Sequence, residues 1–345
     1  MKIRKRGISI GRLPVGEKNC ITDVSGVKVG HVTIDHKIGE GHDRSCTGVT
    51  AILPHEGNLF RKKVTAASYV LNGFGKTTGL VQLNELGVLE SPIMLTNTFG
   101  VPAVTQGTLE YMLDQNPEIG ETTGTVNVVV GECNDSYLNS IRQFPVKPRH
   151  ALEAIGRAST ESAEEGAVGA GKGMVCFGYK GGIGTSSRVV KTADGPYTVG
   201  VLVLSNFGQK EEFLREKYGI TSNGEGIAET ADGSIMIVLA TDALLSDRQL
   251  QRVAKRCGIG LGRTGSHFSH GSGDIVIAFS TAHKIPHESD SIVETRHQLR
   301  EDHPLINHLF TAAAEATEEA ILNSLSQAET TRGRDGRLVE AYPFN

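Results

Sequence analysis

The stretch Asp232-Gly233-Ser234-Ile235-Met236-Ile237-Val238-Leu239-Ala240 joins a turn dipeptide to a serine and then to an unbroken apolar run. A run of this length, rich in aliphatic residues, is typical of a strand that is buried on both faces. Ser234 therefore stands at the mouth of a buried strand, directly after a residue with wide backbone freedom. Two interpretations are open here. Either Asp-Gly is an ordinary loop that ends at Ser234, or Gly233-Ser234 is a self-cleavage point and Ser234 is a nucleophile.

Composition restricts the class of protein. The 345 residues carry a formal net charge of −4 without a basic stripe, so neither nucleic acid nor an anionic membrane is expected as a partner. The five cysteines are scattered and form no C-x-x-C motif, which favours reduced thiols and a cytoplasmic location. No apolar run has the length of a membrane span, and glycines interrupt the basic N-terminal stretch, so we expect no signal peptide.

Short apolar strands and helices follow one another in mixed order. We expect strands within 21–34, 48–54, 92–98, 126–130, 198–204, 235–240 and 272–281. Helices are predicted over 80–86, 104–113, 151–165 and 246–257, with a long final helix that includes residues 306–321. The polar stretch 210–230 is expected to be a flexible excursion before Ser234. This order, without a strict βαβα alternation or a linker, predicts a single domain of helix-covered sheets.

Two segments come close to known binding motifs, a phosphate loop and a zinc site, but do not match them. The segment 166–173 nearly spells a phosphate loop, but Gly173 stands where Ser or Thr is required, and a predicted helix precedes it. The close histidine pairs fit no zinc motif, and they are His267 with His270 and His283 with His287. No G-x-S-x-G elbow is present. We therefore expect no metal, no cofactor and no α/β-hydrolase serine site.

Polar residues stand at the ends of several predicted apolar strands, and these are Glu132, Asn134, Asn206, Ser234, Ser272 and Asp274. Strand ends at neighbouring positions of one sheet can converge on one pocket. The set is chemically sufficient for acyl transfer, with Ser234 as nucleophile and Asn206 as donor to an oxyanion. Ser272 and Asp274 can relay or orient a proton, and Glu132 can hold a substrate cation. Polar residues also end strands that have no function, so the spacing leaves both interpretations open.

Several longer motifs span nearly the whole chain. They are Asp23-Val24-Ser25-Gly26-Val27-Lys28-Val29-Gly30-His31, Gly169-Ala170-Gly171-Lys172-Gly173-Met174, Lys180-Gly181-Gly182-Ile183-Gly184-Thr185-Ser186-Ser187-Arg188, Ser205-Asn206-Phe207-Gly208, Gly233-Ser234-Ile235, Arg263-Thr264-Gly265-Ser266 and Gly271-Ser272-Gly273-Asp274. Together they resemble the self-processing L-aminopeptidase/D-esterase and β-peptidyl aminopeptidase group, peptidase family S58.

The resemblance implies an α/β (α+β) fold, a four-layer αββα sandwich similar to ornithine acetyltransferase and reminiscent of N-terminal-nucleophile hydrolases. It also implies autoproteolysis between Gly233 and Ser234 into an α chain (1–233) and a β chain (234–345) that stay associated. The implied activity is that of a serine aminopeptidase on short peptides, amides or esters, in a homotetramer. Two alternatives remain: an acyltransferase of the ornithine acetyltransferase type, and an unprocessed scaffold without enzymatic activity.

Site residues follow from the same resemblance, position by position. Ser234 matches the nucleophile, with Ser272 and Asp274 as its partners, and Asn206 matches the oxyanion-hole asparagine. Glu132 matches the acid that holds the free amino group of the substrate. Two positions depart from the family pattern. Asp274 replaces a glutamate, which shortens the carboxylate by one methylene. One branch has tyrosine at the position of Asn134, here a candidate substrate-binding residue and second oxyanion donor.

Overall fold

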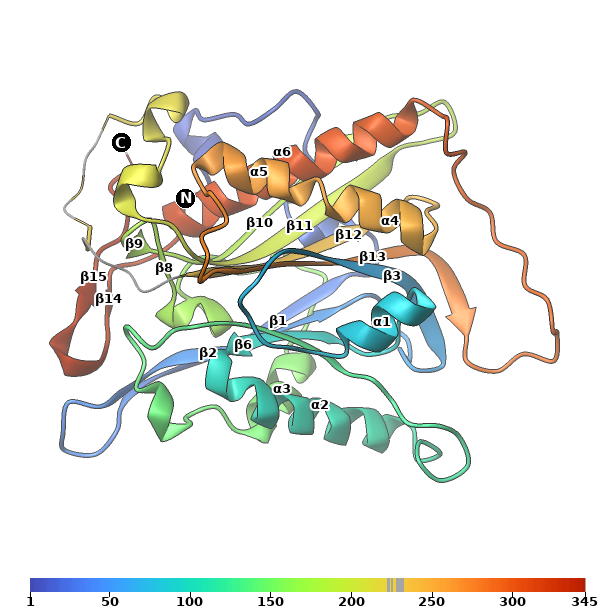
Figure 1. Ribbon diagram of the computed structural model, residues 1–345, viewed down its shortest axis with the longest axis horizontal. Coiled ribbons are helices and arrows are strands. Elements are labelled where there is room, and N and C mark those ends of the chain that lie inside the picture. The colour runs from blue at the N-terminus through green and yellow to red at the C-terminus, as the bar shows by residue number, and fades with distance from the viewer. Residues whose placement is uncertain (222–223, 225, 228–232, 345) are drawn as a thin grey trace.

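The structure is a computed structural model that describes residues 1–221, 224, 226–227 and 233–344. Its layers run from helices through one sheet and a second sheet to further helices (Figure 1). The four-layer αββα sandwich implied by the resemblance is thus confirmed. Asp232 of the quoted stretch, and part of the predicted excursion 210–230, lie outside the described residues.

The sheet that carries Ser234 has the strand order β10-β11-β12-β13-β3-β5. Its members are β3 (Lys62–Gly73), β5 (Val88–Leu89), β10 (Gly182–Val190), β11 (Tyr197–Asn206), β12 (Ser234–Thr241) and β13 (Gly273–Pro286). Strands β12 and β13 run parallel, and β11 and β3 flank this pair in antiparallel orientation. The strand that begins at Ser234 therefore lies in the interior of its sheet.

The other main sheet has the strand order β1-β2-β6-β7-β4. Its members are β1 (Lys28–Lys37), β2 (Arg44–Leu53), β4 (Thr77–Thr78), β6 (Ile93–Asn97) and β7 (Val129–Cys133). Two small hairpins complete the described strands, β8 (Val175–Cys176) with β9 (Tyr179–Lys180) and β14 (Thr331–Arg332) with β15 (Leu338–Val339). Strands β6 and β7 run parallel, with helix α2 (Val101–Gln115) in the connection between them.

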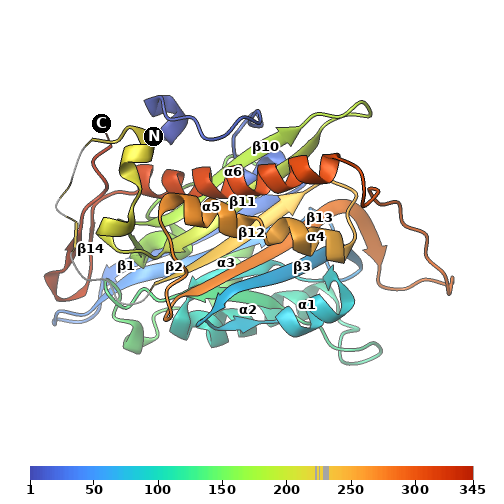
Figure 2. The same ribbon diagram turned by 45° about the horizontal axis from the view of Figure 1, so that its top comes forward.

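Helices cover the outer face of each sheet, as Figure 2 shows most clearly for α6. Helices α4 (Asp247–Ala254), α5 (Cys257–Thr264) and α6 (Leu305–Ser326) pack on the sheet of β12. Helix α2 and helix α3 (Pro148–Gly156) cover the other sheet, and α1 (Leu80–Leu86) contacts β3 and β5. The short 3-10 helices are η1 (Ile3–Arg6), η2 (Ile21–Asp23), η3 (Thr98–Gly100), η4 (Ile141–Gln143), η5 (Gly169–Gly173), η6 (Lys210–Glu212), η7 (Arg215–Tyr218) and η8 (Arg334–Gly336). Among the described residues, no helix combines the length and the apolar character needed to cross a bilayer.

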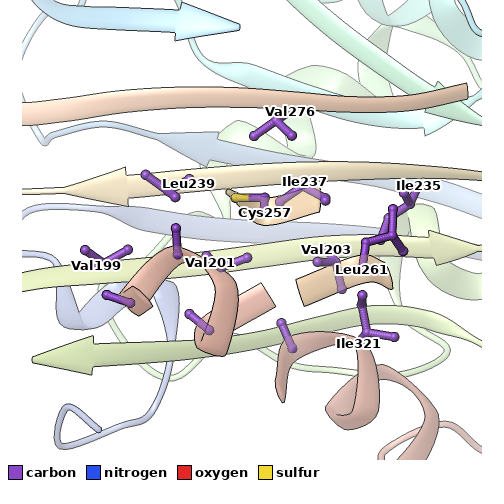
Figure 3. Packing of buried hydrophobic residues seen from close by; sticks show 14 of the residues in the cluster. Val199, Val201, Val203, Ile235, Ile237, Leu239, Cys257, Leu261, Val276 and Ile321 are labelled. Atoms are coloured by element: carbon purple, nitrogen blue, oxygen red, sulfur yellow. The ribbon is translucent and has the colours of Figure 1, made fainter. Parts of the chain in front are cut away.

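Strand β12 is buried on both faces, as its apolar run predicts. One set of its side chains packs toward α5 and α6, shown in Figure 3 for Ile235, Ile237 and Leu239. The alternate set fills the space between the two sheets and consists of Met236, Val238 and Ala240. Burial of each large aliphatic side chain contributes about 1.5–3 kcal/mol relative to exposure. The packing on both faces holds the first residue of the strand, Ser234, on a rigid support.

The two sheets approach each other closely where β7 crosses β12. A Cβ on Gly131 would lie 2.5 Å from Cε of Met236, so a larger residue would displace the end of this side chain. Only glycine fits this contact without displacement of the methionine. The next residue of β7, Glu132, is thereby held near the edge of the other sheet.

A buried charge network joins α6 to β10 and to the N-terminal segment. The guanidinium of Arg188 is inaccessible to solvent and donates to Glu315 Oε2 at 3.1 Å and to Glu319 Oε2 at 2.8 Å. Arg4 adds a hydrogen bond of 2.8 Å from Nε to Oε1 of Glu319. Because each buried carboxylate has a cationic partner, the helix carries these charges inside the protein without an uncompensated group.

Candidate active site

Three strand ends meet at one edge of the β12 sheet. Asn206, the last residue of β11, lies opposite Ser234, the first residue of β12, and Ser234 lies opposite Gly273, the first residue of β13. The hydroxyl oxygen of Ser234 accepts a hydrogen bond of 3.1 Å from the N–H of Gly273, and the residue is 6 % exposed. The predicted convergence of polar strand ends is therefore present at Ser234.

Asn206 has an amide whose orientation is fixed by two main-chain groups. Its Oδ1 accepts a hydrogen bond of 2.9 Å from the N–H of Val175, and its Nδ2 donates one of 3.0 Å to the carbonyl of Asn134. A main-chain N–H can only donate and a carbonyl can only accept, so these partners leave one possible orientation. The second Nδ2 hydrogen remains able to donate to an oxyanion formed at the neighbouring Ser234.

Ser272 and Asp274 flank the glycine that contacts Ser234. The Ser272 hydroxyl donates a hydrogen bond of 2.7 Å to Oδ1 of Asp274, and Asp274 is inaccessible to solvent. Burial raises the pKa of the Asp274 carboxyl to about 6, against the opposing effect of the Ser272 hydrogen bond. A carboxyl with a pKa in this range can exchange a proton near neutral pH.

Glu132 lies inside β7, so the prediction that it follows a strand ending at residue 130 is wrong. The strand extends to Cys133 because it pairs in parallel with β6. Oε1 of Glu132 accepts a hydrogen bond of 2.8 Å from the N–H of Lys76, and Oε2 accepts one from the hydroxyl of Thr98. A Cβ on Gly75 would lie 3.7 Å from this Oε1 and 3.4 Å from Cα of Gly273, which places the carboxylate close to the Ser234 edge.

The Asn134 side chain is exposed, and its Oδ1 accepts a hydrogen bond of 3.0 Å from the N–H of Ser136. Its main-chain carbonyl, rather than its side chain, contacts Asn206. Substrate binding by the Asn134 side chain stays a prediction. The main-chain contribution depends on the folded path of the chain, which residue spacing does not reveal.

Gly233 packs against the end of β11. A Cβ on this residue would lie 2.2 Å from the carbonyl oxygen of Asn206 and 2.5 Å from Cα of Phe207. No side chain fits this space without movement of the backbone. The residue before Ser234 is therefore held against the strand that supplies the amide of Asn206.

Thr98 and the main-chain N–H groups of Lys76 and Val175 also contact the predicted site residues, and the sequence motifs give no signal for them. Within the described part of the chain, no cluster of three or more histidine, cysteine, aspartate or glutamate side chains is arranged to hold a metal ion. The chemistry that the arrangement offers is acyl transfer. It combines a hydroxyl, an amide donor, a hydroxyl–carboxyl pair and an anchored carboxylate.

Comparison with known proteins agrees with this chemistry. The family model for "Peptidase family S58" matches residues 19–339. The chain is 39% identical over 363 residues to beta-peptidyl aminopeptidase BapA of Sphingosinicella microcystinivorans, covering 99% of this chain and 89% of the relative.

Solved structures are similar over almost the whole chain. The PH0078 protein of Pyrococcus horikoshii OT3 matches with a TM-score of 0.92 and 50% identity, covering 99% of this chain and 96% of the other. The L-aminopeptidase D-Ala-esterase/amidase of Ochrobactrum anthropi, described as a variant of the Ntn hydrolase fold, matches with a TM-score of 0.88, 33% identity and coverage of 99% and 95%. The chain therefore belongs to peptidase family S58 and is a hydrolase of the aminopeptidase type.

Proposed function

We propose that Ser234 is the nucleophile of this aminopeptidase and that the chain activates itself by cleavage before Ser234. The observation that carries the proposal is the register of three strands, which places Asn206, Ser234 and Gly273 side by side at one sheet edge. A nucleophile, an oxyanion donor and the Ser272–Asp274 pair are thereby joined on a rigid support.

Self-cleavage follows as an intramolecular acyl shift. Ser234 Oγ attacks the carbonyl carbon of Gly233, the C–N bond breaks, and the nitrogen of Ser234 takes a proton and becomes a free amine. Water then hydrolyses the ester, which leaves a carboxylate on Gly233 and restores the hydroxyl. The products are the α chain 1–233 and the β chain 234–345. The close fit of Gly233 against the main chain of Asn206 supports this step, because the scissile residue packs on the residue whose side chain carries the amide donor.

Substrate hydrolysis repeats the chemistry between molecules. Ser234 Oγ attacks the substrate carbonyl, and its proton passes either to its own α-amine or to the Ser272–Asp274 pair. An α-amine with a pKa of about 8 is a suitable base near neutral pH. The second Nδ2 hydrogen of Asn206 donates to the oxyanion, the leaving amine takes the proton, and water releases the acyl group from Ser234.

Glu132 is the anchor for the free amino group of the substrate. Its carboxylate is 3% exposed and fixed by Lys76 and Thr98, so it offers a buried negative charge of defined position. We propose short peptides and amides with a free N-terminal amine as substrates. The relative named beta-peptidyl aminopeptidase brings peptides with N-terminal β-amino acids into this class.

The test of the nucleophile is Ser234→Ala compared with the wild-type chain. On denaturing electrophoresis the wild type gives two bands, and the N-terminal sequence of the smaller band starts at Ser234. The variant gives one uncut band and no hydrolysis of amino-acid p-nitroanilides. An active Ser234→Ala protein, or a wild type that stays intact on prolonged incubation, would refute the proposal. An acceptor amine added to the wild-type assay distinguishes hydrolysis from acyl transfer by the product formed.

Glu132→Gln tests the amine anchor, since it removes the charge and keeps the size. KM rises for substrates with a free amine and stays unchanged for their N-acetylated counterparts. Equal changes for both substrates would remove the proposed role of Glu132.

Association into a homotetramer is also proposed from the family resemblance, and light scattering of the processed protein tests it.

A further inference from the structure

We propose that Lys180 is a positioning residue that fixes and polarises the amide of Asn206 through the peptide unit between Met174 and Val175. This inference rests on the proposed function, in which Asn206 donates to the oxyanion. Lys180 lies on β9 and has no place in the catalytic steps described above.

Lys180 is completely buried, and its ammonium group makes hydrogen bonds only to main-chain carbonyls of the described chain. Nζ donates to the oxygens of Gly171 at 2.9 Å, Met174 at 2.7 Å and Gly181 at 2.7 Å. An ammonium group has three hydrogens, so each is used. None of these partners is a carboxylate, and the charge therefore stands without a counter-ion in direct contact.

Such a burial is unfavourable in itself. Removal of an ammonium group from water costs several kcal/mol, which partial charges on neutral carbonyls offset only in part. Desolvation accordingly lowers the pKa of Lys180 to about 7. A methionine would fill a similar volume without this cost, so the presence of lysine points to a role for its hydrogen bonds.

One of those hydrogen bonds leads directly to the candidate active site. The carbonyl of Met174 and the N–H of Val175 belong to the same peptide unit, which is planar and rigid. Lys180 holds the oxygen of this unit, and the N–H at its other end donates to Oδ1 of Asn206 at 2.9 Å. The N–H of Gly181 donates to the same Met174 oxygen at 3.1 Å, so Lys180 and the Gly181 N–H together fix where the N–H of Val175 points.

The hydrogen bonds that lead from Lys180 to Asn206 all point in one direction. The ammonium donates to a carbonyl, the N–H of that peptide donates to Oδ1 of Asn206, and Nδ2 of Asn206 donates to the carbonyl of Asn134. Aligned hydrogen bonds polarise one another, with an effect that grows in a low-dielectric interior. In its protonated form, Lys180 therefore strengthens Asn206 as a donor to negative charge that develops at Ser234.

The test combines variants at two positions. Lys180→Met removes the donors, Val175→Pro removes the N–H that links the peptide to Asn206, and Val175→Ala is the matched control that keeps this N–H. Met174 has φ −84° and ψ 146°, the extended conformation that a residue before proline prefers, so the backbone there suits the proline. The kcat and KM of each processed variant are measured per mole of cleaved chain.

We expect Lys180→Met to lower kcat about tenfold with KM unchanged, because an oxyanion donor acts on the transition state. In the Val175→Ala background the same loss appears, whereas in the Val175→Pro background Lys180→Met has no further effect. Equal losses in both backgrounds, or a change in KM alone, would overturn the positioning role.

Folding and the proposed function are separated by two further measurements. If Lys180→Met aggregates, Lys180→Gln is measured in its place, because a glutamine keeps two N–H donors. Aggregation of both variants would make Lys180 a folding residue and reject the proposal. The wild type and Val175→Ala are assayed in parallel on a free-amine p-nitroanilide. An inactive wild type contradicts the proposed function, while an active wild type with additive losses contradicts only the inference on Lys180.

Discussion

The hydroxyl of Ser272 donates a 2.7 Å hydrogen bond to Oδ1 of Asp274, while Oδ2 of the same carboxyl is buried without a partner among the described residues. Burial raises the pKa of this carboxyl to about 6, above its ordinary value of 3.8. The Asp274 carboxyl therefore changes its charge near pH 6, next to the glycine that contacts Ser234.

If the Ser272–Asp274 pair takes the proton of Ser234, activity should rise with pH through about 6, because only the ionised Asp274 can accept a proton through Ser272, whereas the α-amine route gives a rise at about pH 8. In Asp274→Asn this limb of the kcat/KM profile disappears and the maximal rate falls about 100-fold.

The contribution of Asp274 to the free energy of unfolding should fall as pH rises. The folded state retains the proton of Asp274 longer than the unfolded state, so its contribution to stability is complete below pH 4 and is lost between pH 4 and pH 6. Urea unfolding of Ser234→Ala with and without Asp274→Asn, at several pH values, checks the sign; a stability difference independent of pH would contradict it.

Gly233→Ala should block maturation. The added Cβ would lie 2.2 Å from the carbonyl oxygen of Asn206, so the scissile carbonyl would move away from Ser234. Electrophoresis over several days should show the uncut chain. Gly156→Ala is the matched control, because a Cβ there meets nothing within 4 Å, and it should mature like the wild type. Normal cleavage of Gly233→Ala would show that this close contact has no role in processing.

Thr98→Val should weaken the binding of free-amine substrates. The change removes the hydroxyl that donates to Oε2 of Glu132 and, among the described residues, leaves the N–H of Lys76 as the donor to this carboxylate. We expect KM for an amino-acid p-nitroanilide to rise about three- to tenfold, which corresponds to about 0.6–1.4 kcal/mol, the typical net contribution of one hydrogen bond. Thr98→Ser keeps the donor and should behave like the wild type. If the serine and valine variants have the same KM, the hydroxyl does not orient Glu132.

Arg188→Met should destabilise the fold strongly. It leaves the carboxylates of Glu315 and Glu319 buried without the guanidinium, and removal of one partner from a buried ion network costs about 3–5 kcal/mol. The change in unfolding free energy is measured by urea denaturation. Arg300→Ala removes a charge from an ion pair on the surface and should leave the unfolding midpoint unchanged. An effect of Arg188→Met no larger than that of Arg300→Ala would contradict the structural role of the network.

Local sequence patterns predict those strands and helices that are defined by an apolar run or by a capping motif. The apolar run after Ser234 is a strand buried on both faces, and α1 has the predicted bounds Leu80–Leu86. Ser246 caps α4 by accepting from the N–H of Gln249, as the capping-box pattern predicts. In each case, neighbours in sequence suffice to define the structure.

The predictions fail where contacts with residues distant in sequence determine the position and the ends of a strand or helix. Strand β10 is absent from the predicted strands, and its buried Arg188 is stabilised there by ion pairs with α6. The helix expected to reach residue 165 ends at Gly156, and the helix expected to stop at Gly258 is followed by a second one that begins at Cys257. Polar strand ends indicated the candidate site. The residues that orient the site side chains, such as Thr98 and Lys180, lie in segments remote in sequence, so only the folded structure identifies them.

The strand order of the β12 sheet has a consequence for how a two-part enzyme could be made. Strands β12 and β13 belong to the part of the chain after residue 233, while β11 and β3, on either side of them, belong to the part before it. Synthesised alone, the later part would expose unpaired strand edges on both flanks, and the earlier part would lack the centre of its sheet; such edges promote aggregation. Continuity of the polypeptide at this point thus serves assembly, while in the folded protein the interleaved strands would keep the two parts associated after a break.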